Sequence, residues 1–193
     1  MDRKQLSAFF TVVGAAALLA LALLSSPGKA EAKPTSYSFD GGTARQQATV
    51  RAALDASSFD WSLVPGVVTI HIAKGVSDSY STKGNIWLQP ALLAHGKAAW
   101  GVIQHEYAHQ VDFFLFDAAV RARLTKLLGA KTWWAGQPGL RHSQLGCERF
   151  ASTLAWAYWP SRQNALIRFA HAEATAMPPA KFRQLLDNLL SHG

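Results

Sequence analysis

The chain has 193 residues and a formal net charge of +7, with 49% hydrophobic and 16% charged residues. This length suffices for one domain with its own core, and it excludes two full domains once a short N-terminal segment is set aside. Cys147 is the only cysteine, which excludes an intrachain disulfide, so packing or a bound metal must stabilise the fold. The basic residues are scattered without a nucleic-acid-binding motif, so we expect no nucleic acid partner.

Residues 1–32 have the pattern of an export signal. Arg3 and Lys4 give a basic start, residues 6–24 are uncharged and largely apolar, and residues 30–32 have the small-x-small sequence of a cleavage site. The alternative is an uncleaved membrane anchor, because the apolar run is almost long enough to span a bilayer. Both interpretations predict a secreted or extracytoplasmic domain over 33–193, with membrane association only through an uncleaved N-terminal segment.

The predicted elements are short extended segments first and helices afterwards. Thr43 and Gln46 have the spacing of a capping box, which predicts a helix that ends near Ala56. Around it we expect an extended lead-in at 34–40, a strand at 67–73, a polar loop at 77–85 and a second strand at 86–88. Further helices are expected at 97–116, 118–128, 143–159, 162–176 and 180–191, with a connecting loop at 129–140. This order indicates an α+β fold, a short mixed sheet followed by a helical bundle.

The segment His105-Glu106-Tyr107-Ala108-His109 carries the strongest functional pattern in the chain. Histidines four residues apart on a helix project about 40° apart around its axis, so both rings can bind one metal ion. A glutamate directly after the first histidine lies beside that metal, where it can take a proton from an activated water. We therefore expect His105 and His109 to hold zinc and Glu106 to act as the general base.

The alternative for this segment is a helix that carries two ordinary histidines. Glu106 would then be a charged residue within an apolar helix, since no lysine or arginine lies three or four positions away. A metal site accounts for that charge, whereas two surface or core histidines do not. The pattern therefore favours metal binding.

A catalytic zinc needs a third protein ligand and one position open to water. The extended motif with a third histidine is excluded, because Asp112 stands where its glycine belongs and Leu115 where its last histidine does. Glu148 is favoured, since it lies on a predicted helix of small and aromatic residues, where a carboxylate needs a partner. The structural alternative is a salt bridge between Glu148 and Arg149. The other downstream ligand candidates are His142, His171 and Glu173.

Residues around the predicted ligands have less specific interpretations. Asp112 follows His109 by one helical turn, so it could accept the proton of that imidazole or be an ordinary polar residue. A donor to the transition-state oxyanion is also expected near the metal, and His142 is preferred over Arg141 and Tyr158.

The aromatic residues near these segments are expected to lie in the core. Tyr107 points away from the face of the helix that carries the histidines. Trp133 and Trp134 could instead line a substrate cleft, but tryptophans are more often core residues, and we predict that place for both.

Residues 105–112 and 147–152 resemble the gluzincin metallopeptidases, in which His-Glu-x-x-His is completed by a glutamate on a later helix. The stretch His-Glu-Tyr-Ala-His-Gln-Val-Asp is most similar to the branch of the Mlc titration factor and the anthrax lethal factor catalytic domain. There too the spacing to the third ligand is long. The resemblance covers about residues 70–158. It implies a zincin-like domain whose short sheet lies over the motif helix, with an edge strand that pairs with an extended peptide.

The chain departs from these relatives at two positions. In that branch a tyrosine about two turns before the third ligand assists catalysis, and here Arg141 and His142 occupy that neighbourhood. Thermolysin relatives also place an acid four residues after the glutamate, where this chain has Ser152. Either a different donor, with His142 preferred, therefore assists catalysis, or the activity differs from that of these relatives.

Together these patterns predict an exported zinc-dependent metallopeptidase. His105, His109 and Glu148 are expected to bind Zn²⁺, with Glu106 as general base and His142 as the second catalytic group. The expected partner is a peptide or protein substrate. The alternatives are a zinc-binding surface module that has lost its activity, and a hydrolase of amide bonds in the cell wall.

Overall fold

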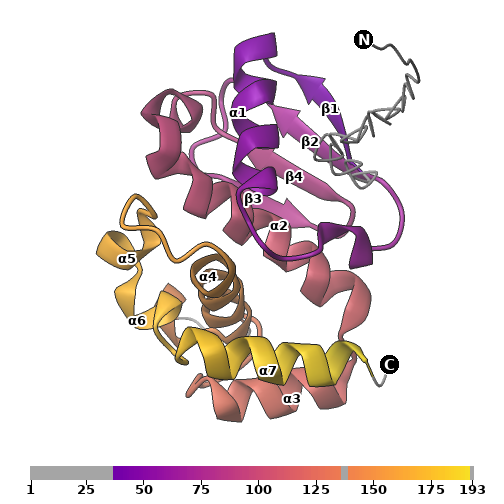
Figure 1. Cartoon of the computed structure of the whole chain (residues 1–193), viewed down its shortest axis with the longest axis vertical. Coiled ribbons are helices and arrows are strands. Elements are labelled where there is room, and N and C mark those ends of the chain that lie inside the picture. Colours follow the sequence, from indigo (N-terminus) through magenta and orange to yellow (C-terminus); the bar gives the residue numbers. More distant parts are fainter. Residues whose placement is uncertain (1–36, 136–138, 192–193) are drawn as a thin grey trace, which may run out of the picture. The chain divides into compact units, whose positions relative to one another are not determined.

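The computed structural model describes residues 37–135 and 139–191 of the chain. Over these residues the fold is α+β, with a mixed four-stranded sheet in the first part of the chain and helices in the rest (Figure 1). The predicted export segment, residues 1–32, lies outside the described residues. No helix among the described residues is both long enough and apolar enough to cross a membrane.

The sheet has the strand order β1-β2-β4-β3. Strands β1 (Tyr37–Gly41), β2 (Val68–Ile72) and β4 (Asn85–Leu88) are parallel, and β3 (Tyr80–Thr82) pairs antiparallel with β4 at one edge. Strand β2 alternates between buried and partly buried residues, as expected for a strand with one face on the core. The two predicted strands are confirmed. Of the extended lead-in expected at 34–40, residues 37–40 belong to β1, and residues 34–36 lie outside the described residues.

Strand β3 lies within residues 77–85, so the prediction of an uninterrupted loop there is wrong. Its sequence, Tyr80-Ser81-Thr82, has no alternation of apolar and polar residues that would have indicated a strand. The strand forms through backbone pairing with β4, which is a contact that the local sequence does not specify. As the edge strand, β3 borders the site described below.

The α-helices follow the sheet along the chain, except α1, which lies between β1 and β2. Their bounds are α1 (Ala44–Asp55), α2 (Trp100–Leu115), α3 (Ala118–Leu127), α4 (Gly146–Tyr158), α5 (Leu166–Phe169), α6 (His171–Ala174) and α7 (Pro179–Leu190), with 3-10 turns η1 (Trp61–Leu63), η2 (Leu92–Ala99) and η3 (His142–Gln144). The predicted capping box at Thr43 and Gln46 is present.

The single helix predicted at 162–176 is wrong, because this segment forms α5 and α6 with a break at Ala170 (φ −126°, ψ 37°). The break turns α6 onto α4. There Thr153 Oγ1 donates to the Glu173 carbonyl oxygen at 2.8 Å, and Ser152 Oγ donates to the Glu173 carboxylate at 3.2 Å. These buried hydrogen bonds replace the continued helix that the local sequence favours.

Helix α2 runs through the middle of the domain. Figure 1 shows the sheet and α1 on one side of it and helices α3 to α7 on the other, and α2 packs against α1, β3 and α4. Its residues Ile103, Tyr107 and Val111 belong to a continuous apolar core with the sheet and α4. Gly101 allows a close approach, since a Cβ there would lie 2.0 Å from Asn164 Oδ1. A helix surrounded in this way holds its polar side chains in fixed positions.

Candidate metal centre

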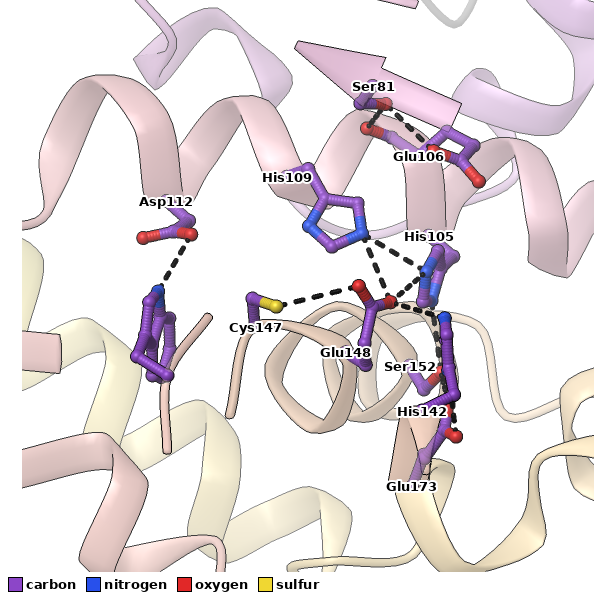
Figure 2. A network of polar contacts seen from close by, with 11 residues as sticks. Ser81, His105, Glu106, His109, Asp112, His142, Cys147, Glu148, Ser152 and Glu173 are labelled. Atoms are coloured by element: carbon purple, nitrogen blue, oxygen red, sulfur yellow. Dashed lines mark hydrogen bonds and ion pairs between the residues drawn. The ribbon is translucent and has the colours of Figure 1, made fainter. Parts of the chain in front are cut away.

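Helices α2 and α4 bring the three predicted metal ligands together (Figure 2). His105 and His109 project from one face of α2, and Glu148 lies in the first turn of α4. Glu148 Oε2 is 3.1 Å from His105 Nε2 and 3.4 Å from His109 Nε2, and these two nitrogens are 3.2 Å apart. The three side chains therefore offer ligand atoms around one point, and the group could hold a metal ion.

The second nitrogen of His105 is held by a hydrogen-bond chain that begins at Glu173. Ser152 Oγ donates to Glu173 Oε2 at 3.2 Å, and the same hydroxyl lies 3.0 Å from His105 Nδ1. Because the serine proton goes to the carboxylate, Ser152 Oγ accepts the Nδ1 proton of His105. His105 Nε2 is then the nitrogen whose lone pair faces the candidate metal position.

His109 has no such support behind it. Its Nδ1 is buried and has no hydrogen-bond partner among the described residues. Of the two interpretations of Asp112, the one in which it accepts this proton does not hold, because Asp112 accepts from Arg121 Nε at 2.7 Å and from Trp133 Nε1 at 3.0 Å. One helical turn separates Asp112 from His109, but these two partners draw its carboxylate towards α3 and the following loop.

The electrostatics of the cluster centre on Glu148. Burial alone would raise the pKa of Glu148, but hydrogen bonds from three histidines, led by His105, hold it far below its ordinary value. Burial alone would lower the pKa of His109, but its hydrogen bond to Glu148 and the charge of Glu148 raise it. Electron-rich atoms this close together need a shared positive charge, which protons or a metal ion can provide.

His142, the predicted oxyanion donor, lies at the edge of this cluster. Its Nε2 is 2.9 Å from Glu148 Oε2 and its Nδ1 is 3.0 Å from Glu173 Oε1, while 61% of its side chain is exposed. The hydrogen bonds to Glu148 and Glu173 raise the pKa of His142 to about 10. The structure thus places an imidazole beside the candidate metal position and within reach of solvent, with both nitrogens in contact with carboxylates.

Glu106, the predicted general base, is held by the edge strand. Ser81 Oγ of β3 is 2.8 Å from Glu106 Oε2 and 2.9 Å from the Glu106 carbonyl oxygen. Only 6% of Glu106 is exposed. Sequence analysis missed Ser81, because a serine in a polar segment carries no signal that it will contact a helix 25 residues away.

A pocket of 180 Å³ lies over these groups. It is lined by the ligand cluster with Glu106 and His142, by the edge-strand segment at 79–81, and by the stacked rings of Phe113 and Trp134. Trp133 is buried as predicted, whereas Trp134 is 39% exposed and lines this pocket, so the core prediction is wrong for Trp134. The cluster therefore opens to solvent beside a sheet edge.

Comparisons of the chain with protein-family models, with curated protein sequences and with solved structures found no match. The function is therefore inferred from the residues of this pocket and from their distances. Those residues are a group that could hold a metal ion, a neighbouring carboxylate and an exposed histidine.

The contacts in the structure support neither a salt bridge between Glu148 and Arg149 nor His171 as a metal ligand. Arg149 donates to the carbonyl oxygens of Ser143 and Leu128 and forms no ion pair with Glu148. His171 is exposed and its Nδ1 contacts Thr175. Of the remaining candidates, Glu173 lies behind the cluster and supports it.

Proposed function

We propose that the protein is a zinc-dependent metallopeptidase in which His105, His109 and Glu148 hold Zn²⁺. Two imidazole nitrogens and one carboxylate oxygen are a donor set of catalytic zinc, which keeps a fourth position for water or substrate. Ligand atoms about 2.0–2.1 Å from a tetrahedral zinc lie about 3.3 Å from one another. The separations of 3.1, 3.2 and 3.4 Å agree with that spacing, and this agreement carries the proposal.

The residues of the pocket favour zinc and hydrolysis over other metal chemistry. Magnesium and calcium prefer six or more oxygen ligands, which two imidazoles do not provide. Iron(II) in oxygenases uses a similar set of two histidines and one carboxylate. Glu106 beside the ligands favours hydrolysis, because a base positioned next to the metal serves the activation of water.

Each residue of the pocket has a role in this reaction. His105, His109 and Glu148 would hold the zinc ion, which would supply Lewis-acid activation of water and of the scissile carbonyl. Glu106 takes the proton of the attacking water at its carboxylate, and Ser81 fixes the position of Oε2. Glu106 then passes the proton to the leaving amine. His142 Nε2, which contacts Glu148 Oε2 at 2.9 Å in this structure, would be released to donate its N–H to the oxyanion when Glu148 binds the metal.

The edge strand supports a peptide as the substrate. Strand β3 is the terminal strand of the sheet, so its outer backbone groups are available for pairing with an added strand. Residues Ser79, Tyr80 and Ser81 line the same pocket as the candidate ligands. A peptide that extends the sheet at β3 would therefore carry its amide bonds past Glu106.

Other features of the chain support the proposed domain type, its location outside the cytoplasm and its role as an enzyme. A mixed sheet with an antiparallel edge strand, followed by the motif helix and a later ligand helix, supports a zincin-like domain of the gluzincin type. Residues 1–32 support a secreted or extracytoplasmic location. A surface module without activity would need neither Glu106 nor an open pocket, so both features favour an enzyme.

Replacing Glu106 by Gln tests this function. The Glu106→Gln protein should lose peptide hydrolysis by about 10²- to 10⁴-fold and keep one equivalent of zinc, because the amide cannot accept the proton. Elemental analysis and cleavage of a random peptide library measure the two properties. Asp55→Asn, which removes a carboxylate charge on the exposed side of α1, is the matched control.

Three outcomes would contradict the proposal. Full activity of the Glu106→Gln protein would exclude this base, and a purified protein without zinc would exclude this metal. Turnover of peptidoglycan fragments without cleavage of any library peptide would replace the peptidase with a hydrolase of cell-wall amides. Wild-type cleavage should also stop on addition of a chelator.

A further inference from the structure

Two further pockets lie in sequence beyond the metal pocket, each sharing one lining residue with the pocket before it. His142 lines both the metal pocket and a second pocket of 270 Å³, which is formed by residues 141–143 and 169–173. Phe169 lines both this second pocket and a third one of 350 Å³, which lies between η2 and α5. The three pockets therefore adjoin one another through His142 and Phe169.

The third pocket gathers positive charge. Lys97 from η2 and Arg162 and Arg168 from the α4–α5 region line it together with His95, and no acidic residue does. None of these three cations forms an ion pair within the described part of the chain; Lys97 lies over the Trp100 ring at 5.2 Å. Like charges held around one hollow repel each other, and a bound anion relieves this repulsion. We call Lys97, Arg162 and Arg168 the basic cluster.

The second pocket also has a cationic side chain. Arg141 lines it, and its acidic member Glu173 is buried and already bonded to His142 and Ser152. No free carboxylate therefore faces a ligand between the metal centre and the basic cluster, among the residues that line these pockets.

Phe169 stands between the second and third pockets and is 87% exposed. A single exposed aromatic side chain needs no explanation by itself. At this place, however, its ring forms part of the wall of both pockets, so a chain that follows them from His142 would cross it.

We propose that the substrate of this peptidase is an acidic polypeptide, which passes from the metal pocket over Phe169 and places its carboxylates against the basic cluster. This inference rests on the proposed function and names its substrate class. The cations line hollows that adjoin the metal pocket, which suits a flexible chain better than a flat anionic membrane. The acidic segment lies on one side of the scissile bond only, because the basic pockets adjoin the metal centre on the side of His142.

Two pairs of peptides of equal length test the preference. In the first pair, one peptide carries aspartate and glutamate on one side of the cleaved bond and the other carries asparagine and glutamine there. The second pair has the same substitutions on the opposite side. At low salt the wild-type protein should cleave the acidic member of one pair with about tenfold higher kcat/KM, mainly through KM, and the difference should shrink as salt rises.

The double variant Arg162→Glu, Arg168→Glu should lose this preference. The matched control is Arg123→Glu, Lys126→Glu, which makes the same charge change at exposed positions of α3 and should keep it. Equal cleavage of both members of each pair by the wild-type protein would overturn the inference and leave the peptidase function intact. Retention of the preference by the Arg162→Glu, Arg168→Glu protein would overturn it as well.

A binding measurement separates the inference from catalysis. Fluorescence anisotropy of a labelled acidic peptide should show binding to the Glu106→Gln protein, and the added Arg162→Glu, Arg168→Glu changes should weaken it about tenfold. Charge-dependent binding without cleavage of any peptide by the wild-type protein would support the basic cluster and contradict the peptidase. Binding to vesicles of anionic phospholipid without binding to the acidic peptide would overturn the inference in favour of a membrane.

Discussion

The two histidines of the candidate metal centre share a helix but differ in what lies behind them. The imidazole of His105 is followed by Ser152 and then by the buried carboxylate of Glu173, whereas Nδ1 of His109 has no hydrogen-bond partner among the described residues. A hydrogen bond behind a ligand fixes its tautomer and orients its ring. The α4–α6 side of the centre is therefore held by polar contacts, and the α2 side beyond His109 by packing.

The residues around the ligands also have more hydrogen bonds on the α4–α6 side of the site than on the sheet side. Glu148, His142 and Glu173 form a continuous set of hydrogen bonds on the α4–α6 side, with separations of 2.9 and 3.0 Å. On the sheet side, Glu106 is held by the single hydroxyl of Ser81. Metal binding should therefore depend mainly on the α4–α6 side, and proton transfer on the sheet side. The variants below are arranged to test this division, beginning with the largest expected effect.

Glu148→Ala should abolish stable metal binding. The change removes one of three ligands and also the acceptor that both α2 histidines face. The loss of affinity should exceed the ~10- to 100-fold that removal of a supporting residue causes. Metal content after dialysis, measured beside far-ultraviolet circular dichroism to check the fold, gives the result. One full equivalent of metal in a folded Glu148→Ala protein would remove Glu148 from the ligand set.

In the Ser152→Ala protein, Nδ1 of His105 should lack a hydrogen-bond partner, as Nδ1 of His109 already does among the described residues. Without the hydroxyl, His105 Nδ1 loses its acceptor, and zinc affinity should fall about 10- to 100-fold in a competition titration with a chelator. Glu173→Gln should lower it to a similar extent and also reduce kcat, because Glu173 supports His142 too. Cobalt-substituted protein should show an altered visible spectrum in both variants, which a change in global stability alone would not produce.

Thr153→Val is the matched control for this pair. Its hydroxyl donates to the main-chain oxygen of Glu173 and not to the carboxylate, so the change weakens the packing of α6 without touching the hydrogen-bond chain. Stability should fall by about 1 kcal/mol while zinc affinity stays the same. If the Ser152→Ala protein bound zinc as tightly as the wild type, the contact between Ser152 and His105 would contribute to packing and not to metal binding.

The part of the site that sequence analysis could predict is the part set by local geometry. The spacing of His105 and His109 follows from the helix period alone, and Glu148 followed from the cost of burying a carboxylate without a partner. Ser152 and Glu173 meet only because the chain breaks at Ala170. That break depends on contacts with α4, which a window of neighbouring residues does not contain.

The strands, too, could be predicted only where the local sequence specifies them. The strands at β2 and β4 were predictable, because their β-branched and apolar residues face a core. Strand β3 was not, since its three residues contribute backbone pairing and side chains to the site but little to the core. The sequence predicts a core position for Trp134, yet only the course of the chain at 131–135 decides that it lines a pocket. Non-local contacts therefore determine which residues surround the ligands, whereas helical spacing determines the two histidine ligands, His105 and His109.

Ser81→Ala should have the smallest effect and should separate the two sides most clearly. Glu106 loses the hydroxyl that fixes Oε2, and one hydrogen bond contributes about 0.5–1.5 kcal/mol, so kcat should fall roughly 2- to 10-fold. Zinc affinity should not change, because no ligand or supporting residue is touched. Ser62→Ala, which removes an exposed hydroxyl that contacts Asp60 in η1, is the control and should leave kcat unchanged. If zinc affinity instead fell with Ser81→Ala, the sheet would support the metal as well as the base, and the two sides of the site would act as one unit.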